Sequence, residues 1–488
     1  MAVKAVDRRT FLQQVAVATG GAALWPFADV VATAEASRGR TLVPVQDLRD
    51  GKVRLHLPEG FEYRSFHDTD GPPIVLNDGT VLPGRHDGMA AFPGPEGKIW
   101  LVRNHEVNGP TTAFGPGTPY DPRAGGGTTT SLVDGQGNVH QAFTSLNGTQ
   151  MNCMGGRMPW GSWITCEETV NGPDVGADFT GASNVTLTRQ HGYIFEVPAG
   201  GQSNRVPIKS AGRFAHEAVA FDPKGGILYL TEDNFGFPSG FYRYVPPSNP
   251  METGRLADGG RLQMLAVAGT PQADLARAQP QRATYRVTWV DIEQPDVLFP
   301  YTPGLPASTT NNDAINFVGN QGREQGAAWF SRIEGCVHDN GVIYFCCTQG
   351  GGPPEASFGP IADGFGNGFG QIWAYRINAD VLQLIYESPG NAALDLPDNV
   401  AVRSGRGTLV LCEDGPVDNY LRGLNRGGQI FDIALNRLTR NAPPNAPRFG
   451  EEFAGATFSP DGETLFVNIQ AAQGITFAIW GKWARLGV

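Results

Sequence analysis

Hydrophobic and polar residues alternate along most of this chain in short runs that end at turns. Residues 212–223 alternate and end in Asp-Pro, residues 227–233 repeat the pattern, and residues 240–245 complete a set of three. Runs rich in β-branched and aromatic residues, bounded by Gly, Pro, Asn and Asp, favour strands. Long amphipathic helical patterns are hard to find. The sequence therefore predicts an all-β fold.

Similar sets of three strands recur over residues 335–376, 396–432 and 453–470. In each set a strand ends in a turn, a second strand ends in polar residues, and a third strand follows. This repetition is typical of a β-propeller, whose blades take about 40 to 45 residues. We predict a single β-propeller of six or seven blades with loop insertions over residues 37–488. The pattern is weaker near 250–320, which we interpret as an insertion.

Residues 1–36 have a different character from the rest of the chain. Arg8 and Arg9 precede an apolar pair, a weakly hydrophobic stretch over 15–24, and small residues where a peptidase could cut. This three-part pattern predicts a twin-arginine signal peptide and, as a partner, the twin-arginine export machinery. The apolar stretch is shorter than the about 20 residues of a lasting membrane span. We expect a mature protein in the periplasm or outside the cell, without a stable membrane span.

Composition narrows the possible partners. The 65 glycines and 37 prolines follow no collagen-like period and fit turn-rich strands. A net charge of −11 argues against a nucleic-acid partner and favours solubility or cation binding. We expect the protein to be a monomer.

The chain has six cysteines, at positions 153, 166, 336, 346, 347 and 412. An even number in an exported protein normally suggests disulfides. Cys346 and Cys347, however, are neighbours in an expected strand and should face opposite ways. No CxxC pair is present, which argues against a zinc knuckle. Cys336, Cys346 and Cys412 have the character of small buried apolar residues.

One hairpin-sized segment combines a thiol with carboxylates. Cys153 is followed by Gly155-Gly156, and the expected strand at 162–166 leads to Glu167 and Glu168. Strand neighbours face opposite ways, so at most one of these two glutamates joins the thiol; we expect it to be Glu168. A thiolate beside carboxylates suits a transition ion such as iron.

Other polar residues also fall at or near strand ends. With the hairpin's own residues, the set is Glu106, Cys153, Glu168, Glu217, Arg332, Glu334, Asp398, Glu413 and Asp414. In a propeller such positions can converge on one axial face, where crowded carboxylates would raise each other's pKa unless cations were bound. Their oxygens suit calcium. Arg332, on the same strand face as Glu334, is either a salt-bridge partner or a clamp for phosphate oxygens.

The sequence resembles the PhoX-type alkaline phosphatases, exported bacterial enzymes with a β-propeller fold and a mixed iron and calcium centre. The resemblance covers nearly the whole mature chain. It rests on Asn104-His105-Glu106, Asn152-Cys153 with Gly155-Gly156, Thr165-Cys166-Glu167-Glu168, Arg213-Phe214-Ala215-His216-Glu217, Arg332-Ile333-Glu334-Gly335 and Pro397-Asp398-Asn399. The chain is shorter than characterised members and has Ile333 where the family pattern leads us to expect proline. These departures leave room for an altered substrate range.

The resemblance implies that Cys153, Glu168, Glu217 and Glu334 ligate two ferric ions. It further implies that Arg332 holds the phosphate and that the remaining carboxylates bind Ca²⁺. The implied reaction is hydrolysis of a small phosphomonoester, in which a metal-bridging oxide or hydroxide attacks phosphorus.

Two other functions remain open at this stage. A calcium-dependent lactonase or arylesterase on a similar propeller would explain the carboxylates, but it gives no role to Cys153 or Arg332. A non-catalytic exported propeller could use its metals for structure and bind a ligand or partner. Propellers host many functions, so the choice depends on the chemistry of the site.

Overall fold

Strands dominate the computed structural model, which describes residues 41–253, 256–403 and 406–488. The predicted signal peptide, including Arg8 and Arg9, lies outside the described residues. No helix in the described part of the chain has the length and apolar character needed to cross a membrane.

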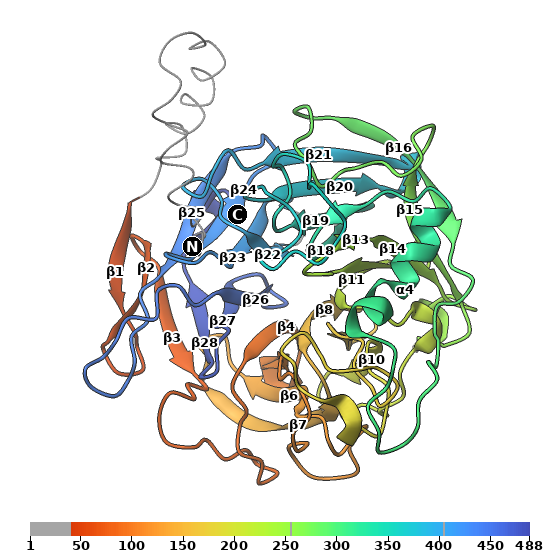
Figure 1. Ribbon diagram of the computed structural model, residues 1–488. Helices are drawn as coiled ribbons and strands as arrows, with labels where there is room; N and C mark the ends of the chain where they lie inside the picture. The colour runs from red at the N-terminus through yellow and green to blue at the C-terminus, as the bar shows by residue number, and fades with distance from the viewer. Residues whose placement is uncertain (1–40, 254–255, 404–405) are drawn as a thin grey trace, which may run out of the picture. The chain divides into compact units, whose positions relative to one another are not determined.

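The strands form antiparallel sheets that follow one another along the chain (Figure 1). The first two sheets are β4 (His86–Pro93), β5 (Ile99–His105), β6 (Gly126–Val133) and β7 (Val139–Thr149), then β8 (Asn152–Arg157), β9 (Ser162–Glu167) and β10 (Ile194–Pro198). The next strand groups are β11 (His216–Asp222), β12 (Ile227–Glu232), β14 (Phe241–Val245) and β15 (Arg261–Val267), then β18 (Ile333–Asp339), β19 (Val342–Cys347), β20 (Gln371–Arg376) and β21 (Val381–Glu387).

Two further sheets combine strands from both ends of the described chain. One contains β22 (Pro397–Val402), β23 (Leu409–Glu413), β24 (Tyr420–Leu424) and β25 (Ile430–Asn436), extended by β2 (Val53–Pro58) and β1 (Leu42–Gln46). The other contains β26 (Phe453–Phe458), β27 (Thr464–Ile469) and β28 (Ile475–Trp480), extended by β3 (Glu62–Phe66). The pairing of β3 with β28 joins the start of the chain to its end by backbone hydrogen bonds.

The innermost strands close a ring. They are β4, β8, β11, β18, β22 and β26, and each contacts the next, with β26 contacting β4. Figure 1 shows the sheets arranged radially around this ring. The prediction of an all-β propeller is therefore confirmed.

The segment interpreted as an insertion contributes to the sheets as well as to loops. β15 extends the sheet begun by β11, and β16 (Thr284–Asp291) pairs with both β15 and β21. A helix, α4 (Asn311–Glu324), follows β16. The remaining elements are β13 (Pro238–Ser239), β17 (Phe330–Ser331), α3 (Pro250–Thr253), α5 (Trp483–Leu486) and the short 3-10 helices Pro95–Gly97, Asn184–Thr186, Lys209–Ala211 and Ile377–Ala379.

Every inner strand carries a bulge near its beginning. The register shifts between His86 and Met89, Asn152 and Gly155, His216 and Val219, Ile333 and Cys336, Pro397 and Val400, and Ala454 and Thr457. A bulge redirects the side chains of its unpaired residues and often lies beside an active site. The first unpaired residues are Asp87, Cys153, Glu217, Glu334, Asp398 and Gly455. One position of the repeat therefore supplies a thiol and four carboxylates.

At two of these bulges the second unpaired residue is a glycine, Gly88 or Gly335, that allows close packing between inner strands. A Cβ atom on Gly335 would lie 2.7 Å from the backbone nitrogen of Val400 in β22, and one on Gly88 would lie 2.6 Å from the backbone oxygen of Cys153 in β8. Cβ atoms do not approach other atoms so closely in folded proteins. Glycine is required at these two positions because the next strand occupies the space of a side chain.

Candidate metal centre

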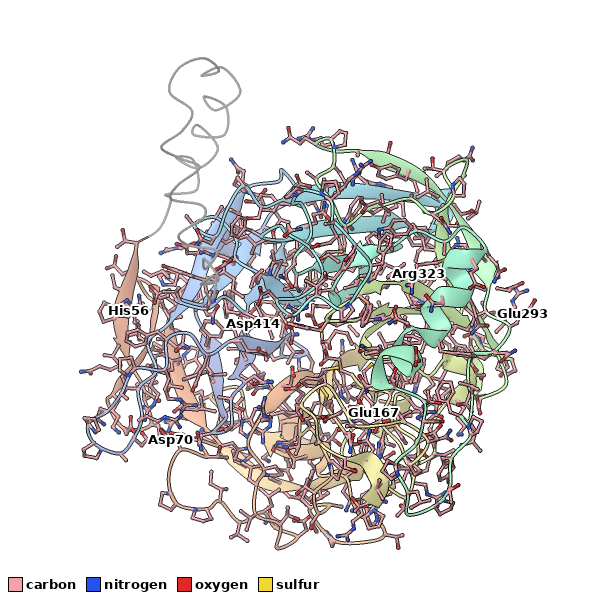
Figure 2. All side chains as sticks on the ribbon, in the orientation of Figure 1. His56, Asp70, Glu167, Glu293, Arg323 and Asp414 are labelled. Atoms are coloured by element: carbon pink, nitrogen blue, oxygen red, sulfur yellow. The ribbon has the colours of Figure 1, made fainter. Side chains whose placement is uncertain are left out.

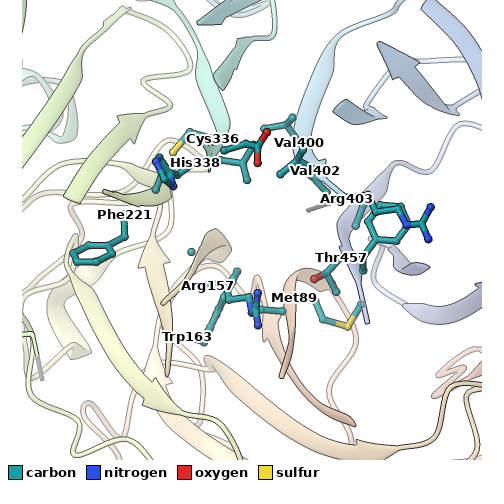
Figure 3. A pocket seen from close by; sticks show the side chains of 18 of the residues that line it. Met89, Arg157, Trp163, Phe221, Cys336, His338, Val400, Val402, Arg403 and Thr457 are labelled. Atoms are coloured by element: carbon teal, nitrogen blue, oxygen red, sulfur yellow. The ribbon is translucent and has the colours of Figure 1, made fainter. Parts of the chain in front are cut away.

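Two cavities lie at opposite ends of the inner strands. The first has a volume of about 640 Å³ and is lined by the bulge residues at the strand beginnings. The second, of about 650 Å³, is lined by residues near the strand ends, including Arg157, Phe221, His338 and Val402 (Figure 3). The potential metal ligands face the first cavity.

Five of the side chains that line the first cavity come from the bulges. Asp87, Cys153, Glu217 and Glu334 are each less than 5% exposed, and Asp398 lines the same cavity. Five strands that are far apart in the sequence thus bring their side chains to one space, as the sequence predicts for Cys153, Glu217, Glu334 and Asp398.

A second layer comes from the residues that directly follow the second strand of each sheet. Glu106, Glu168, Asp233, Asp414 and Gln470 occupy this position and line the cavity. Their backbone N–H groups donate to the residue that precedes the inner strand, namely Arg85, Met151, Ala215, Leu396 and Glu452. The repeated hydrogen bond fixes where each side chain leaves its strand. Figure 2 shows Asp414 toward the middle of the ring and His56 at its edge.

Arg332 precedes an inner strand in the same way, and Thr348 donates to its carbonyl oxygen at 3.0 Å. Its φ of 39° lies in the left-handed region, as do those of Arg85, Met151 and Leu396 at the same position of the repeat. This conformation is uncommon for residues other than glycine. The repeated backbone hydrogen bond holds it, and Arg332 lines the cavity from this position.

Three groups of side chains have the spacing of metal ligands. In each group the ligand atoms lie within 4.8 Å of one another. The groups are Cys153, Glu168 and Glu217; Glu217, Glu334 and Asp398; and Asp398, Asp414 and Glu452. Glu217 and Asp398 each belong to two groups, so the three form one continuous cluster.

The electrostatics of the cluster favour bound cations. Burial, followed by repulsion from Asp398, raises the pKa of Glu217 well above its usual range. Burial and the charge of Asp414 raise the pKa of Asp398 to about 8, against the opposing effect of Arg332. Carboxylates in such surroundings ionise readily only when a cation compensates their charge. One thiol with carboxylates is a suitable donor set for a transition ion, and the carboxylates alone suit calcium. The residues present therefore fit metal ions.

Cys153 carries the only thiol among the residues that line this cavity. Its thiol is 3.1 Å from the carbonyl oxygen of His216. Burial, followed by the charges of Glu217 and Glu168, raises its pKa well above the usual range of a thiol. A thiol with so high a pKa becomes a thiolate at neutral pH only if a cation replaces its proton.

Arg332 is held by two carboxylates at the edge of the cluster. Its Nη2 lies 2.8 Å from Asp233 Oδ2 and 2.7 Å from Glu334 Oε1, and its guanidinium lies 4.8 Å from the centre of the Phe235 ring. Among the described residues, no hydrogen bond acceptor is found for its Nη1. The fixed guanidinium can therefore offer this nitrogen to an anion in the cavity.

Glu106 reaches the cavity, whereas its neighbours do not. Its carboxylate accepts hydrogen bonds from Arg85 and Gln470, and burial raises its pKa to about 7. Asn104 donates to the backbone oxygen of Cys153, and His105 bonds Thr129 and the backbone of Gly84. Asn104 therefore supports the hairpin of Cys153, and His105 supports the neighbouring strands; neither lines the cavity.

Glu413 is the predicted site residue that the structure does not bring into the cavity. Its carboxylate accepts from Arg422 Nε at 2.8 Å and from the backbone N–H groups of Asp395 and Tyr420. The reason is strand alternation, since Glu413 and its neighbour Asp414 point to opposite sides. Glu167 likewise points away from the cavity, to His191 at 2.6 Å, as strand alternation predicts.

Asp87, Asp233 and Glu452 line the cavity but were not singled out from the sequence. Asp87 aligns with Glu217 and Glu334 once the bulges are superimposed, and Asp233 aligns with Glu168 and Asp414. Comparing equivalent positions between the repeated strand sets would have found both. Glu452 directly precedes β26, and Arg332 occupies the equivalent position before β18. Because this position holds an acid in one sheet and a base in another, residue type alone does not identify it as part of the site.

Fold and site together define a β-propeller with an axial cluster of carboxylates and one thiol beside a fixed arginine. The family model described as alkaline phosphatase PhoX matches residues 41–473. The chain belongs to the PhoX alkaline phosphatase family, and it is a phosphatase.

The structure of Pseudomonas fluorescens PhoX in complex with vanadate, a transition state analogue, shares the fold. It is 16% identical, with a TM-score of 0.64 over 91% of this chain and 98% of that chain. The periplasmic gluconolactonase of Pseudomonas aeruginosa is 13% identical over 86% of this chain and 92% of its own, with a TM-score of 0.37. No curated protein matches the sequence.

Proposed function

We propose that this phosphatase hydrolyses phosphomonoesters with a centre of ferric and calcium ions. The observation that carries the proposal is the group Cys153, Glu168 and Glu217, whose ligand atoms lie within 4.8 Å of one another. A thiolate is a poor ligand for calcium and a good one for iron. A purely calcium-dependent site would give Cys153 no role.

The two kinds of metal would occupy different parts of the cluster. Cys153, Glu168, Glu217 and Glu334 would hold iron. The oxygen-only part, Asp398, Asp414 and Glu452, with Glu106 and Asp87 nearby, would hold calcium. When bound, the metal ions would supply Lewis acidity and an activated oxygen nucleophile.

The protein's own residues would bind and orient the phosphoryl group. Arg332 would donate to its oxygens through Nη1, while Asp233 and Glu334 keep the guanidinium in place. A preorganised donor stabilises the charge of the transition state more than that of the ground state. The cavity walls would exclude bulk water and so strengthen these interactions.

Elemental analysis and a substrate comparison test the proposal. Protein isolated from its own export pathway should contain both iron and calcium, and it should hydrolyse a phosphomonoester but not a lactone. Calcium without iron, together with lactone hydrolysis, would favour the lactonase or arylesterase. Calcium alone without turnover of either substrate would favour a binding propeller.

We also propose that the protein is exported as a folded monomer by the twin-arginine machinery. Arg8 and Arg9, with the apolar and small residues that follow, support export by this route. Replacing both arginines with lysine should leave the active phosphatase in the cytoplasmic fraction. Unchanged export of the variant would contradict the proposal, and size-exclusion chromatography tests the oligomeric state.

A further inference from the structure

The lining of the metal cavity includes a group of large apolar side chains in addition to the carboxylates and the thiol. Around the opening stand Phe179, Phe235, Phe237, Ile315 and Ile361. The side chains of Phe179 and Phe235 are 73% and 47% exposed. Large apolar side chains exposed together beside a cavity are typical of ligand-binding sites.

This apolar wall is held in place by hydrogen bonds between its segments. Phe365 N donates to Phe235 O at 2.7 Å, and Ile361 N donates to Gly236 O at 3.0 Å, so two loops run together. Asn234 donates to Asn316 of α4 at 3.3 Å. The helix that carries Ile315 is thereby tied to the loop that carries Phe235. A wall fixed in this way needs little ordering when a ligand binds.

Charge restricts which ligand can enter. Arg332 is the only basic residue among those that line the cavity, whereas ten acidic or thiol side chains line it: Asp87, Glu106, Cys153, Glu168, Glu217, Asp233, Glu334, Asp398, Asp414 and Glu452. Apart from Arg332, no residue that lines the cavity would offer a cation to a second phosphate or carboxylate on the substrate. Desolvating such an unpaired charge is costly.

The apolar wall begins directly beside the residue proposed to hold phosphate. The Arg332 guanidinium lies 4.8 Å from the centre of the Phe235 ring. An ester whose phosphoryl group contacts Arg332 therefore has apolar side chains close to its organic group. The polar exceptions at the opening, Asn234, Asn311 and Asn312, carry no charge.

We infer that the wall formed by Phe179, Phe235, Phe237, Ile315 and Ile361 binds the leaving group, and that the preferred substrates are phosphomonoesters of uncharged, apolar alcohols. This inference rests on the proposed phosphomonoesterase function. It assigns the substrate class and the residues that select it.

The test compares 2-phenylethyl phosphate with ethyl phosphate. Both release a primary alcohol, so the chemistry of bond cleavage is similar and contact of the phenyl ring with the wall is the main difference. We expect kcat/KM to be about tenfold higher for 2-phenylethyl phosphate, which corresponds to about 1.4 kcal/mol. Phe179→Ser and Ile315→Ser should each bring this ratio toward one.

Leu298→Ser is the matched control. Leu298 is 62% exposed but does not line the cavity, so its replacement should leave the ratio unchanged. Iron content and thermal unfolding of each variant would show that the metal centre and the fold are intact.

The outcomes separate the two proposals. If the wild-type protein hydrolyses both esters with equal kcat/KM, or if the ratio is the same in the Phe179 and Ile315 variants as in the wild type, the leaving-group inference is wrong while the phosphatase function stands. If neither ester is hydrolysed by metal-loaded protein, the proposed phosphomonoesterase function itself fails.

Discussion

Arg332 donates to the carboxylate of Asp233 from two nitrogens, Nε at 3.2 Å and Nη2 at 2.8 Å. The two residues are far apart in sequence and belong to neighbouring strand groups, since Asp233 follows β12 and Arg332 precedes β18. This paired contact fixes the plane of the guanidinium. Asp233 therefore acts as a positioning residue for the proposed phosphate site.

The first prediction concerns this contact. Asp233→Asn removes the charge that orients Arg332, and we expect kcat/KM for a phosphomonoester to fall about tenfold or more. The loss should appear mainly in KM if Arg332 binds the ground state and in kcat if it acts in the transition state. Asp222→Asn is the control, because Asp222 is also buried but caps a turn at the far end of β11. Equal activity of the two variants would remove the positioning role.

The second prediction concerns the two cysteines of one hairpin. Cys153→Ala should abolish bound iron and phosphatase activity, because it removes the only thiol that lines the cavity. Cys166 is buried in the same hydrophobic cluster as Cys153 but does not line the cavity, so Cys166→Ala should keep both iron and activity. Elemental analysis of the two purified variants measures their iron content and tests this prediction. Normal iron content in Cys153→Ala would refute the proposed iron site.

The third prediction uses two neighbouring carboxylates that face opposite ways. Glu413→Gln should destabilise the protein by about 2 kcal/mol, because it weakens a buried contact with Arg422, yet leave metal content unchanged. Asp414→Asn should instead lower the calcium content and activity. Urea unfolding and elemental analysis of both variants provide the comparison. Loss of calcium from the Glu413 variant would contradict the placement of Glu413 outside the centre.

The fourth prediction concerns the pH dependence of stability. His191 is fully buried, and its Nδ1 lies 2.6 Å from Glu167 and its Nε2 3.6 Å from Asp121. Burial opposes its charge, but the two carboxylates outweigh this effect and raise its pKa to about 9.

Because the folded pKa of His191 is higher than the unfolded value near 6.5, its contribution to stability is complete below pH 6.5 and is lost as the pH rises through 9. The free energy of unfolding should fall by about 3 kcal/mol over this range. His191→Gln should be less stable at pH 6 and lack this dependence. Urea titrations at several pH values measure it, and an identical pH profile for both proteins would refute the assignment.

The fifth prediction concerns removal of calcium. A calcium-selective chelator should lower both activity and the unfolding temperature, because Asp398, Asp414 and Glu452 are left close together without a cation. Added calcium should restore both. Calorimetry with and without chelator measures the shift. An unchanged unfolding temperature, with calcium shown to be absent, would argue against a calcium site in this group.

Much of the site was predictable because its residues follow local rules. Alternation correctly placed Arg332 and Glu334 on one face and Glu167 and Glu168 on opposite faces. Those rules extend only along one strand. They also allow only one of Glu413 and Asp414 to face the cavity, but they do not say which one, and the prediction that both belong to the site was wrong for Glu413.

By itself the sequence determined the strand content, the repeated sets, and the presence of Cys153 near Glu168, because hydrophobic alternation and turn residues are local properties. Only the tertiary structure decided which strand ends share a cavity. The ring of inner strands brings Asp87, Asp233 and Glu452 to the other ligands. The bulges turn the side chains of their first unpaired residues toward the cavity. Both features depend on backbone hydrogen bonds and close contacts between distant segments, for which no local pattern in the sequence gives a signal.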